Sequence, residues 1–146
     1  MKIYTTSRED YLKAILVLRK RYHEVHAADV ARYLGFSKAS VCHAVSLLTS
    51  EGFLYVDQDY ALQLTDKGWA TAERTYERHC FFADQLIALG VNPKTAMEDA
   101  CRLEHAISDE SFQKLKEKFT PEDPHTKKRH SRLRSAACAV QNDESL

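Results

Sequence analysis

The stretch that decides the fold is AADVARYLGFSKASVCHAVSLLTSEGFLYVDQDYALQLT, residues 27–65. Its first part predicts a short helix that ends at Gly35, because glycine readily adopts the left-handed backbone of a helix C-terminus. Ser37 is a typical helix N-cap, and the apolar residues after it recur at helical spacing until Gly52. Two short β-type runs then flank a polar turn, which predicts a hairpin. Two helices joined by a tight turn and followed by a two-stranded wing are typical of a winged helix-turn-helix.

The rest of the chain is predicted to be helical. Residues 7–22, 65–90, 92–108 and 109–119 each show helical spacing of apolar positions, whereas the residues from 120 onward are polar and include the basic run KKRHSRLR. We therefore expect a mainly α protein with three parts. These are a winged helix-turn-helix DNA-binding domain (residues 1–66), an all-helical dimerisation and metal-binding domain (67–120) and a polar, basic C-terminal tail (121–146).

Composition narrows the class of protein. The 146 residues carry 21 basic and 21 acidic side chains, so a nucleic-acid partner would have to be bound by a local patch. No apolar run approaches the roughly 20 residues that span a bilayer, and the N-terminus lacks a signal-peptide stretch. We expect a cytoplasmic protein with no membrane partner.

The four cysteines, Cys42, Cys80, Cys101 and Cys138, form no CxxC pair. Their scatter argues against a zinc ribbon and a thioredoxin-type redox pair, and leaves room for a lone thiolate ligand. Cys42 and Cys80 are predicted to be buried packing residues.

The residues that would read DNA lie at the start of the second helix of the predicted motif. In such domains this helix enters the major groove with its N-terminal residues at the base edges. Small hydroxyl side chains suit contacts to phosphates and bases, and basic side chains supply charge. The candidate DNA-binding residues are Arg32, Ser37, Lys38, Ala39, Ser40 and His43. The wing tip, residues 57–59, is acidic and unfavourable for groove binding, and small three-helix cores also occur as interaction modules.

A second motif, DACRLEHAIS at residues 99–108, offers metal ligands. Cys101, Glu104 and His105 are spaced i, i+3 and i+4, so on a helix they share one face. A thiol, a carboxylate and an imidazole together suit a divalent transition metal better than calcium or magnesium.

With EDYL at residues 9–12, the winged motif, RH at 78–79 and ACRLEH at 100–105, the chain resembles the DtxR/MntR family of metal-dependent transcriptional repressors. The resemblance covers about residues 5 to 120 and fits the short, two-domain form without an SH3-like domain. In that family a metal bridges the first helix and the dimerisation domain. The resemblance implies, position by position, the metal ligands Asp10, His79, Cys101, Glu104 and His105.

Three positions depart from the family pattern. Lys13 replaces a glutamate of the manganese regulators, and Ala83 and Met97 replace ligands of an ancillary site of the iron-responsive type. The resemblance therefore implies a single metal. The coordination set suits Fe(II) or Mn(II), with the thiolate favouring Fe(II), and Zn(II) or Co(II) would also bind.

The function we expect is metal-dependent DNA-binding repression of iron or manganese uptake genes. A homodimer would bind a double-stranded operator once the metal clamps the N-terminal helix to the dimerisation domain. The residues expected to form the dimer are apolar: Phe81, Phe82, Leu86, Ile87 and Leu89. The alternatives are a metal-independent winged-helix regulator with a decayed site and a small metalloenzyme. We expect no enzyme, because nothing in the sequence resembles a substrate pocket.

Overall fold

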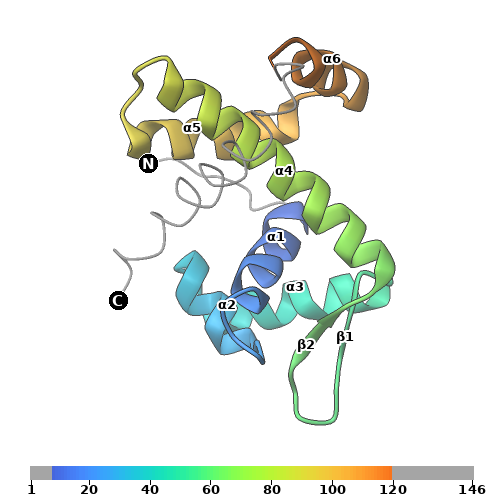
Figure 1. Cartoon of the computed structure of the whole chain (residues 1–146). Helices are drawn as coiled ribbons and strands as arrows, with labels where there is room; N and C mark the ends of the chain where they lie inside the picture. Colours follow the sequence, from blue (N-terminus) through green and yellow to red (C-terminus); the bar gives the residue numbers. More distant parts are fainter. Residues whose placement is uncertain (1–7, 120–146) are drawn as a thin grey trace. The chain divides into compact units, whose positions relative to one another are not determined.

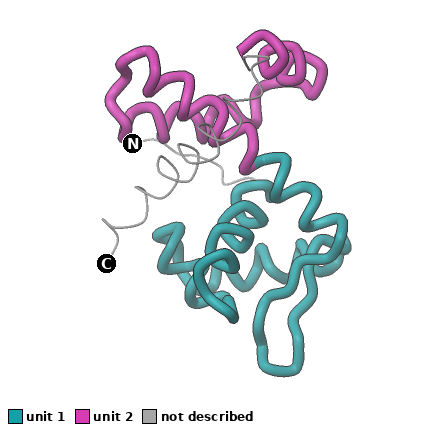
Figure 2. Tube along the Cα trace, in the orientation of Figure 1, with its two compact units in different colours: residues 1–75 teal, residues 76–146 magenta. Residues whose placement is uncertain are grey.

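The computed structural model describes residues 8–119 and confirms a mainly helical chain. Two compact units succeed each other along the sequence, with their boundary between Thr75 and Tyr76 (Figure 2). Within the described range no helix combines the length and the apolarity needed to cross a membrane. In chain order the elements are α1 (Arg8–Arg19), α2 (Ala27–Leu34), α3 (Lys38–Ser50), β1 (Leu54–Val56), β2 (Leu62–Leu64), α4 (Asp66–Ala88), α5 (Pro93–Ala106) and α6 (Asp109–Phe119) (Figure 1).

The first unit is a winged helix-turn-helix, as predicted. Helices α1, α2 and α3 pack on one another, and the hairpin contacts α3 through β1 and α1 through β2 (Figure 1). Its core consists of buried aliphatic side chains, which dominate the stability of such a small unit because each removes apolar surface from water. They include Leu12, Ile15, Leu16, Val30, Val41, Leu48, Leu54 and Leu62.

The tight turn between α2 and α3 follows from two residues. Gly35 adopts the left-handed conformation (φ 70°) at the end of α2 and donates its backbone N–H to the carbonyl of Ala31. Ser37 then caps α3, because its hydroxyl accepts a hydrogen bond from the backbone N–H of Ser40 at 3.2 Å. Both predictions made from the sequence for this turn are confirmed.

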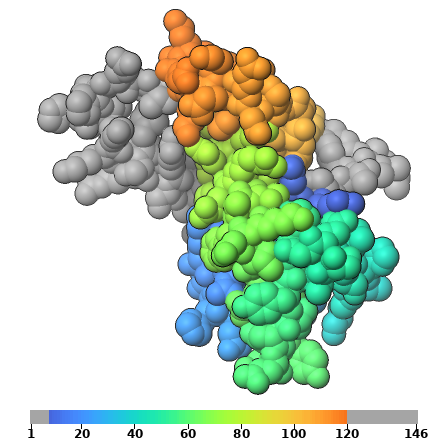
Figure 3. All heavy atoms as spheres, turned by 90° about the vertical axis from the view of Figure 1, so that its right-hand side faces the viewer, coloured from blue at the N-terminus to red at the C-terminus, as the bar shows by residue number. Residues whose placement is uncertain are grey.

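The wing is a two-stranded antiparallel hairpin in which Leu54 faces Leu64 and Val56 faces Leu62. It projects from the helices of its unit (Figures 1 and 3). The Asp57 carboxylate organises the turn, accepting from the backbone N–H groups of Asp59 (2.9 Å) and Ala61 (3.0 Å) and from the Gln63 amide (2.8 Å). The bond from Gln63, followed by those from the backbone, lowers the pKa of Asp57. One of the acidic residues at the wing tip, Asp57, thus stabilises the turn of the hairpin.

The start of α4 is fixed against the end of α3 by a T-x-x-G segment. The Thr65 hydroxyl accepts from the Gly68 N–H at 3.1 Å and donates to the carbonyl of Gly52 at 2.7 Å. A Cβ atom on Gly68 would lie 1.9 Å from the carbonyl oxygen of Phe53. Only glycine at position 68 therefore allows the backbone of α4 to lie this close to the backbone of Phe53.

The second unit, described from Tyr76 to Phe119, is helical, as predicted. Asn92 caps α5 by accepting from the Lys94 N–H at 3.0 Å, and Pro93 occupies the first turn, where no donor is lost. Phe112 of α6 packs edge-on against Phe81 of α4, with ring centroids 5.3 Å apart. This ring contact joins α6 to α4.

The two cysteine predictions have opposite outcomes. Cys80 is buried, as expected, with 6% of its surface exposed. The prediction that Cys42 is buried is wrong, because this residue is exposed on α3. Val41 and Leu48 are the fully buried positions of α3, and the small three-helix core leaves the neighbouring positions of that helix in solvent.

We expect Gly68→Ala to lower the free energy of unfolding by about 1–3 kcal/mol or more, because the added methyl group meets backbone that cannot rotate away. Urea unfolding followed by fluorescence of the neighbouring Trp69, the single tryptophan, measures the loss. Glu73→Ala, at an exposed position of the same helix, is the matched control and should change stability little. Equal stability of the two variants would contradict the close-packing interpretation.

Candidate metal centre and DNA-reading helix

Three of the sequence-predicted metal ligands converge in the second unit. His79 lies on α4, and Cys101 and Glu104 lie one helical turn apart on α5. Each offers a ligand atom, and these atoms lie within 4.8 Å of one another. The His79 Nδ1 atom is 3.0 Å from Glu104 Oε2 and 3.6 Å from the Cys101 sulfur. The i, i+3 spacing on α5 therefore places both ligands beside the histidine of the preceding helix.

Glu104 is the centre of this cluster. Its residue surface is 1% exposed, and a carboxylate can be buried to this degree only with partners for its oxygens. Oε2 lies beside His79, and Oε1 is 3.1 Å from Nε2 of His105. His105 itself retains 24% of its side-chain exposure. The carboxylate therefore joins a buried imidazole to one at the surface.

The donor set fits a divalent transition metal. Imidazole nitrogen, thiolate sulfur and carboxylate oxygen are ligands that such ions share, and all three types lie within reach of one position. Ala83 and Met97, where the resemblance indicates loss of an ancillary site, are buried in an apolar cluster with Ala100 and Phe82. Ala83 and Met97 therefore contribute to packing, and neither side chain offers an imidazole, thiolate or carboxylate ligand.

Asp10 belongs to the first unit, in the first turn of α1. Its side chain is 23% exposed, and Oδ1 lies 3.9 Å from the ammonium group of Lys13 one turn later. The structure thus pairs the candidate ligand with the lysine that departs from the manganese-regulator pattern. A cation near Asp10 would compete with Lys13 for the carboxylate.

Arg78 is a residue whose role sequence reasoning missed. It is 7% exposed, and its Nη1 atom donates to the carbonyl of Ile107 at 2.6 Å, just beyond the end of α5. Its other terminal nitrogen pairs with Asp109 at the start of α6. The residue next to His79 therefore anchors the end of the helix that carries Glu104. The RH dipeptide was the only signal of it in the sequence.

The six candidate DNA-binding residues are all exposed and lie at the end of α2, in the turn and in the first half of α3: Arg32, Ser37, Lys38, Ala39, Ser40 and His43. Three of them already have partners in the protein. Ser37 caps α3 and donates its hydroxyl to that of Ser40 at 2.8 Å, and Arg32 lies 3.6 Å from the carboxylate of Asp29. The exposed surface of α3 is consequently small, hydroxyl-rich and poor in charge.

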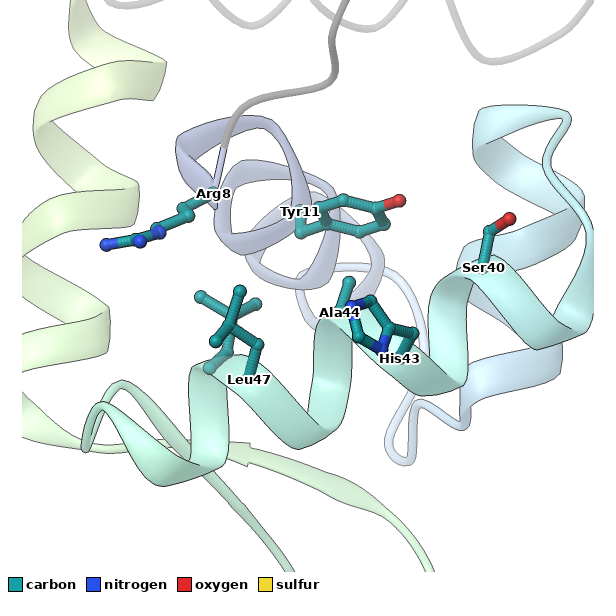
Figure 4. A pocket seen from close by; sticks show the side chains of 7 residues that line it. Arg8, Tyr11, Ser40, His43, Ala44 and Leu47 are labelled. Atoms are coloured by element: carbon teal, nitrogen blue, oxygen red, sulfur yellow. The ribbon is translucent and has the colours of Figure 1, made fainter.

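A cavity of about 310 Å³ lies beside this surface, between α1 and α3 (Figure 4). Sequence reasoning did not include it, because its α1 residues, Arg8 and Tyr11, are remote in sequence from the helix-turn-helix. Their i, i+3 spacing on one face of α1 was the available signal. From α3 the cavity is lined by Ser40, His43, Ala44, Leu47 and Leu48.

Comparison with known proteins gives consistent matches to both parts of the chain. Residues 4–62 match the family described as "Iron dependent repressor, N-terminal DNA binding domain". Residues 65–131 match "Iron dependent repressor, metal binding and dimerisation domain". An HTH-type transcriptional regulator of Methanocaldococcus jannaschii is 33% identical over 118 residues, which are 77% of this chain and 94% of that protein.

Two further relatives are longer proteins. Transcriptional regulator MntR of Salmonella typhimurium is 33% identical over 104 residues, 71% of this chain and 66% of MntR. The structure of the manganese regulator SloR superposes with a TM-score of 0.69 at 28% identity, covering 78% of this chain. The chain spans 54% of the SloR chain, about half its length. These relatives are regulators and not enzymes.

We expect the protein loaded with Co(II) to show a sulfur-to-metal charge-transfer band that is lost in Cys101→Ser, because the soft thiolate would be a direct ligand. Ultraviolet absorption during Co(II) titration measures it. Cys42→Ser is the matched control, since Cys42 is exposed on α3, and it should retain the band. A band that survives Cys101→Ser would exclude this sulfur as a ligand.

Proposed function

Because the chain belongs to the family of iron-dependent repressors, we propose that it is a metal-dependent DNA-binding regulator that represses iron or manganese uptake genes. In this proposal residues 1–66 bind DNA, residues 67–120 form the dimerisation and metal-binding domain, and 121–146, which lie outside the described residues, form a basic tail. The protein acts in the cytoplasm as a homodimer on a double-stranded operator. The metalloenzyme alternative has no support among relatives that are transcriptional regulators.

The observation that carries the proposal is the His79–Cys101–Glu104 cluster, with His79 and Glu104 buried and Cys101 half-buried, within the part of the chain that matches the metal-binding domain. The Glu104 carboxylate lies beside two imidazoles and near a thiol, all groups that bind metals. This argues against a winged-helix regulator whose site has decayed.

The proposed ligands are Asp10, His79, Cys101, Glu104 and His105. Those on α4 and α5 are supported by their proximity to one another, and Asp10 is supported by its match to the first-helix ligand of the family. When bound, the ion supplies a double positive charge that several anionic side chains can share. The thiolate favours Fe(II) over Mn(II), whereas named relatives include manganese regulators, and Zn(II) or Co(II) would also bind.

The proposed regulation follows from which domain carries each metal ligand. Asp10 stands on α1, which packs against α2 and α3, the helices that would contact DNA. The other ligands stand on the helices of the dimerisation domain. Sharing one cation fixes α1 relative to that domain, and so favours the spacing of two recognition helices that half-sites one helical turn apart require. The coupling between metal and DNA must then be reciprocal.

Asp10→Ala should remove the metal dependence of DNA binding while leaving the fold intact. Coupling between two ligands typically amounts to about 1–3 kcal/mol, or about 5- to 150-fold in affinity. Fluorescence anisotropy with the DNA upstream of the protein's own gene, with Fe(II), Mn(II) or chelator, measures the difference. Glu24→Ala, at an exposed position after α1, removes an equal charge and is the control.

Three outcomes are distinguishable in this experiment. Metal dependence in the wild type and its loss in Asp10→Ala support the proposal. A variant that responds as the wild type does would remove Asp10 from the ligand set. Wild-type binding that chelator leaves unchanged would instead favour the metal-independent regulator.

A further inference from the structure

We propose that Arg8 of α1 is a phosphate-binding residue of the DNA interface, and that Glu51 holds it in position in the free protein. This inference rests on the DNA-binding function proposed above and extends that interface to a helix outside the helix-turn-helix. It assigns the cavity between α1 and α3 to the sugar-phosphate backbone of the bound duplex.

The recognition helix needs charge from elsewhere. Within α3, KASVCHAVSLLTS, Lys38 is the one formal cation. The row of side chains along its cavity face, Ser40, His43 and Leu47, carries no permanent charge. Non-specific affinity for DNA comes essentially from cations that neutralise phosphates, so this row requires a neighbouring basic residue.

Arg8 is that neighbour. Its side chain reaches from α1 to the same cavity and is 60% exposed, which leaves its guanidinium accessible to a large ligand. Figure 4 shows Tyr11 of α1 extending over the side of α3 that carries Ser40, His43 and Ala44, and the Arg8 side chain extending the other way, past Leu47. The arrangement combines a cation and hydroxyl donors with the apolar side chains of Ala44 and Leu47. A phosphodiester with its deoxyribose offers the matching anion and apolar ring.

Glu51 gives this arginine a partner that phosphate can replace. Glu51 is the C-cap residue of α3, and its Oε1 atom lies 3.0 Å from Nη2 of Arg8. The Oε2 atom is buried and has no hydrogen-bond partner in the structure. A carboxylate at a helix C-terminus is unfavourable to the helix dipole, and beside DNA it repels phosphate. The pair therefore holds the Arg8 guanidinium at the Leu47 end of the cavity, beside an acceptor that is incompletely satisfied.

An alternative role for Arg8 is indirect: it would favour DNA binding only by neutralising the charge of Glu51. A double variant distinguishes this role from direct phosphate binding. If Arg8 only screens Glu51, then Arg8→Gln combined with Glu51→Gln restores wild-type affinity, because both charges are gone. If Arg8 binds phosphate, the double variant stays weak, since the phosphate contact is still missing.

The test uses the full chain with saturating Mn(II) and a random-sequence DNA duplex, with affinity measured by anisotropy over a range of KCl concentrations. Each phosphate contact contributes about 0.9 to the slope of log affinity against log salt. We expect Arg8→Gln to weaken binding and to reduce the slope by about 0.9 per subunit, and the double variant to keep that reduced slope and to bind more weakly than the wild type. Glu51→Gln alone should bind at least as tightly as the wild type.

Arg21→Gln is the matched control, because Arg21 is exposed beyond the opposite end of α1, and it should retain the wild-type slope. Circular dichroism of each variant checks that α1 is intact. A wild-type slope in Arg8→Gln, or wild-type affinity in the double variant, would overturn the phosphate contact while leaving the proposed function standing. A wild type that binds no duplex under these conditions would overturn both.

Discussion

The contact on which the second unit depends is the placement of a buried carboxylate, Glu104, between the imidazoles of His79 and His105. A carboxylate that is 1% exposed is costly unless its oxygens have partners, so the helices on either side must keep their register. Arg78 supports this register by binding the carbonyl of Ile107 just beyond α5 and the carboxylate of Asp109 on α6. The contacts that keep these helices in register therefore also fix the positions of the candidate ligand atoms.

The first unit carries the proposed DNA-reading helix, α3, in a chain that has no net charge. Its aliphatic core uses one narrow side of α3, and the remaining sides of that helix are in solvent. The exposed side chains there are mostly small or hydroxylated, so they can approach base edges closely but attract the duplex weakly. In the proposed DNA interface, affinity then depends on basic residues outside α3 as well as on Lys38.

Much of this fold could be predicted because short-range rules determine it. Gly35 and Ser37 fix a tight turn through their own backbone and hydroxyl, and the i, i+3 spacing of Cys101 and Glu104 fixes a shared face. Burial was harder to predict. Cys42 was misassigned because apolar spacing does not tell how wide a stripe the core covers. Arg78 was missed because its partners lie more than 25 residues away, at a distance that local patterns do not report.

The uneven exposure of the candidate metal ligands has a kinetic consequence. His79 and Glu104 are enclosed, whereas Cys101 is half-buried and His105 keeps contact with solvent. If these residues hold a metal, His105 would be the ligand most accessible to water, and His79 and Glu104 the least accessible. A metal-dependent regulator has to release its metal as readily as it binds it. In the proposed site, an accessible outer ligand would let metal occupancy follow the free metal concentration, as a fully enclosed structural site would not.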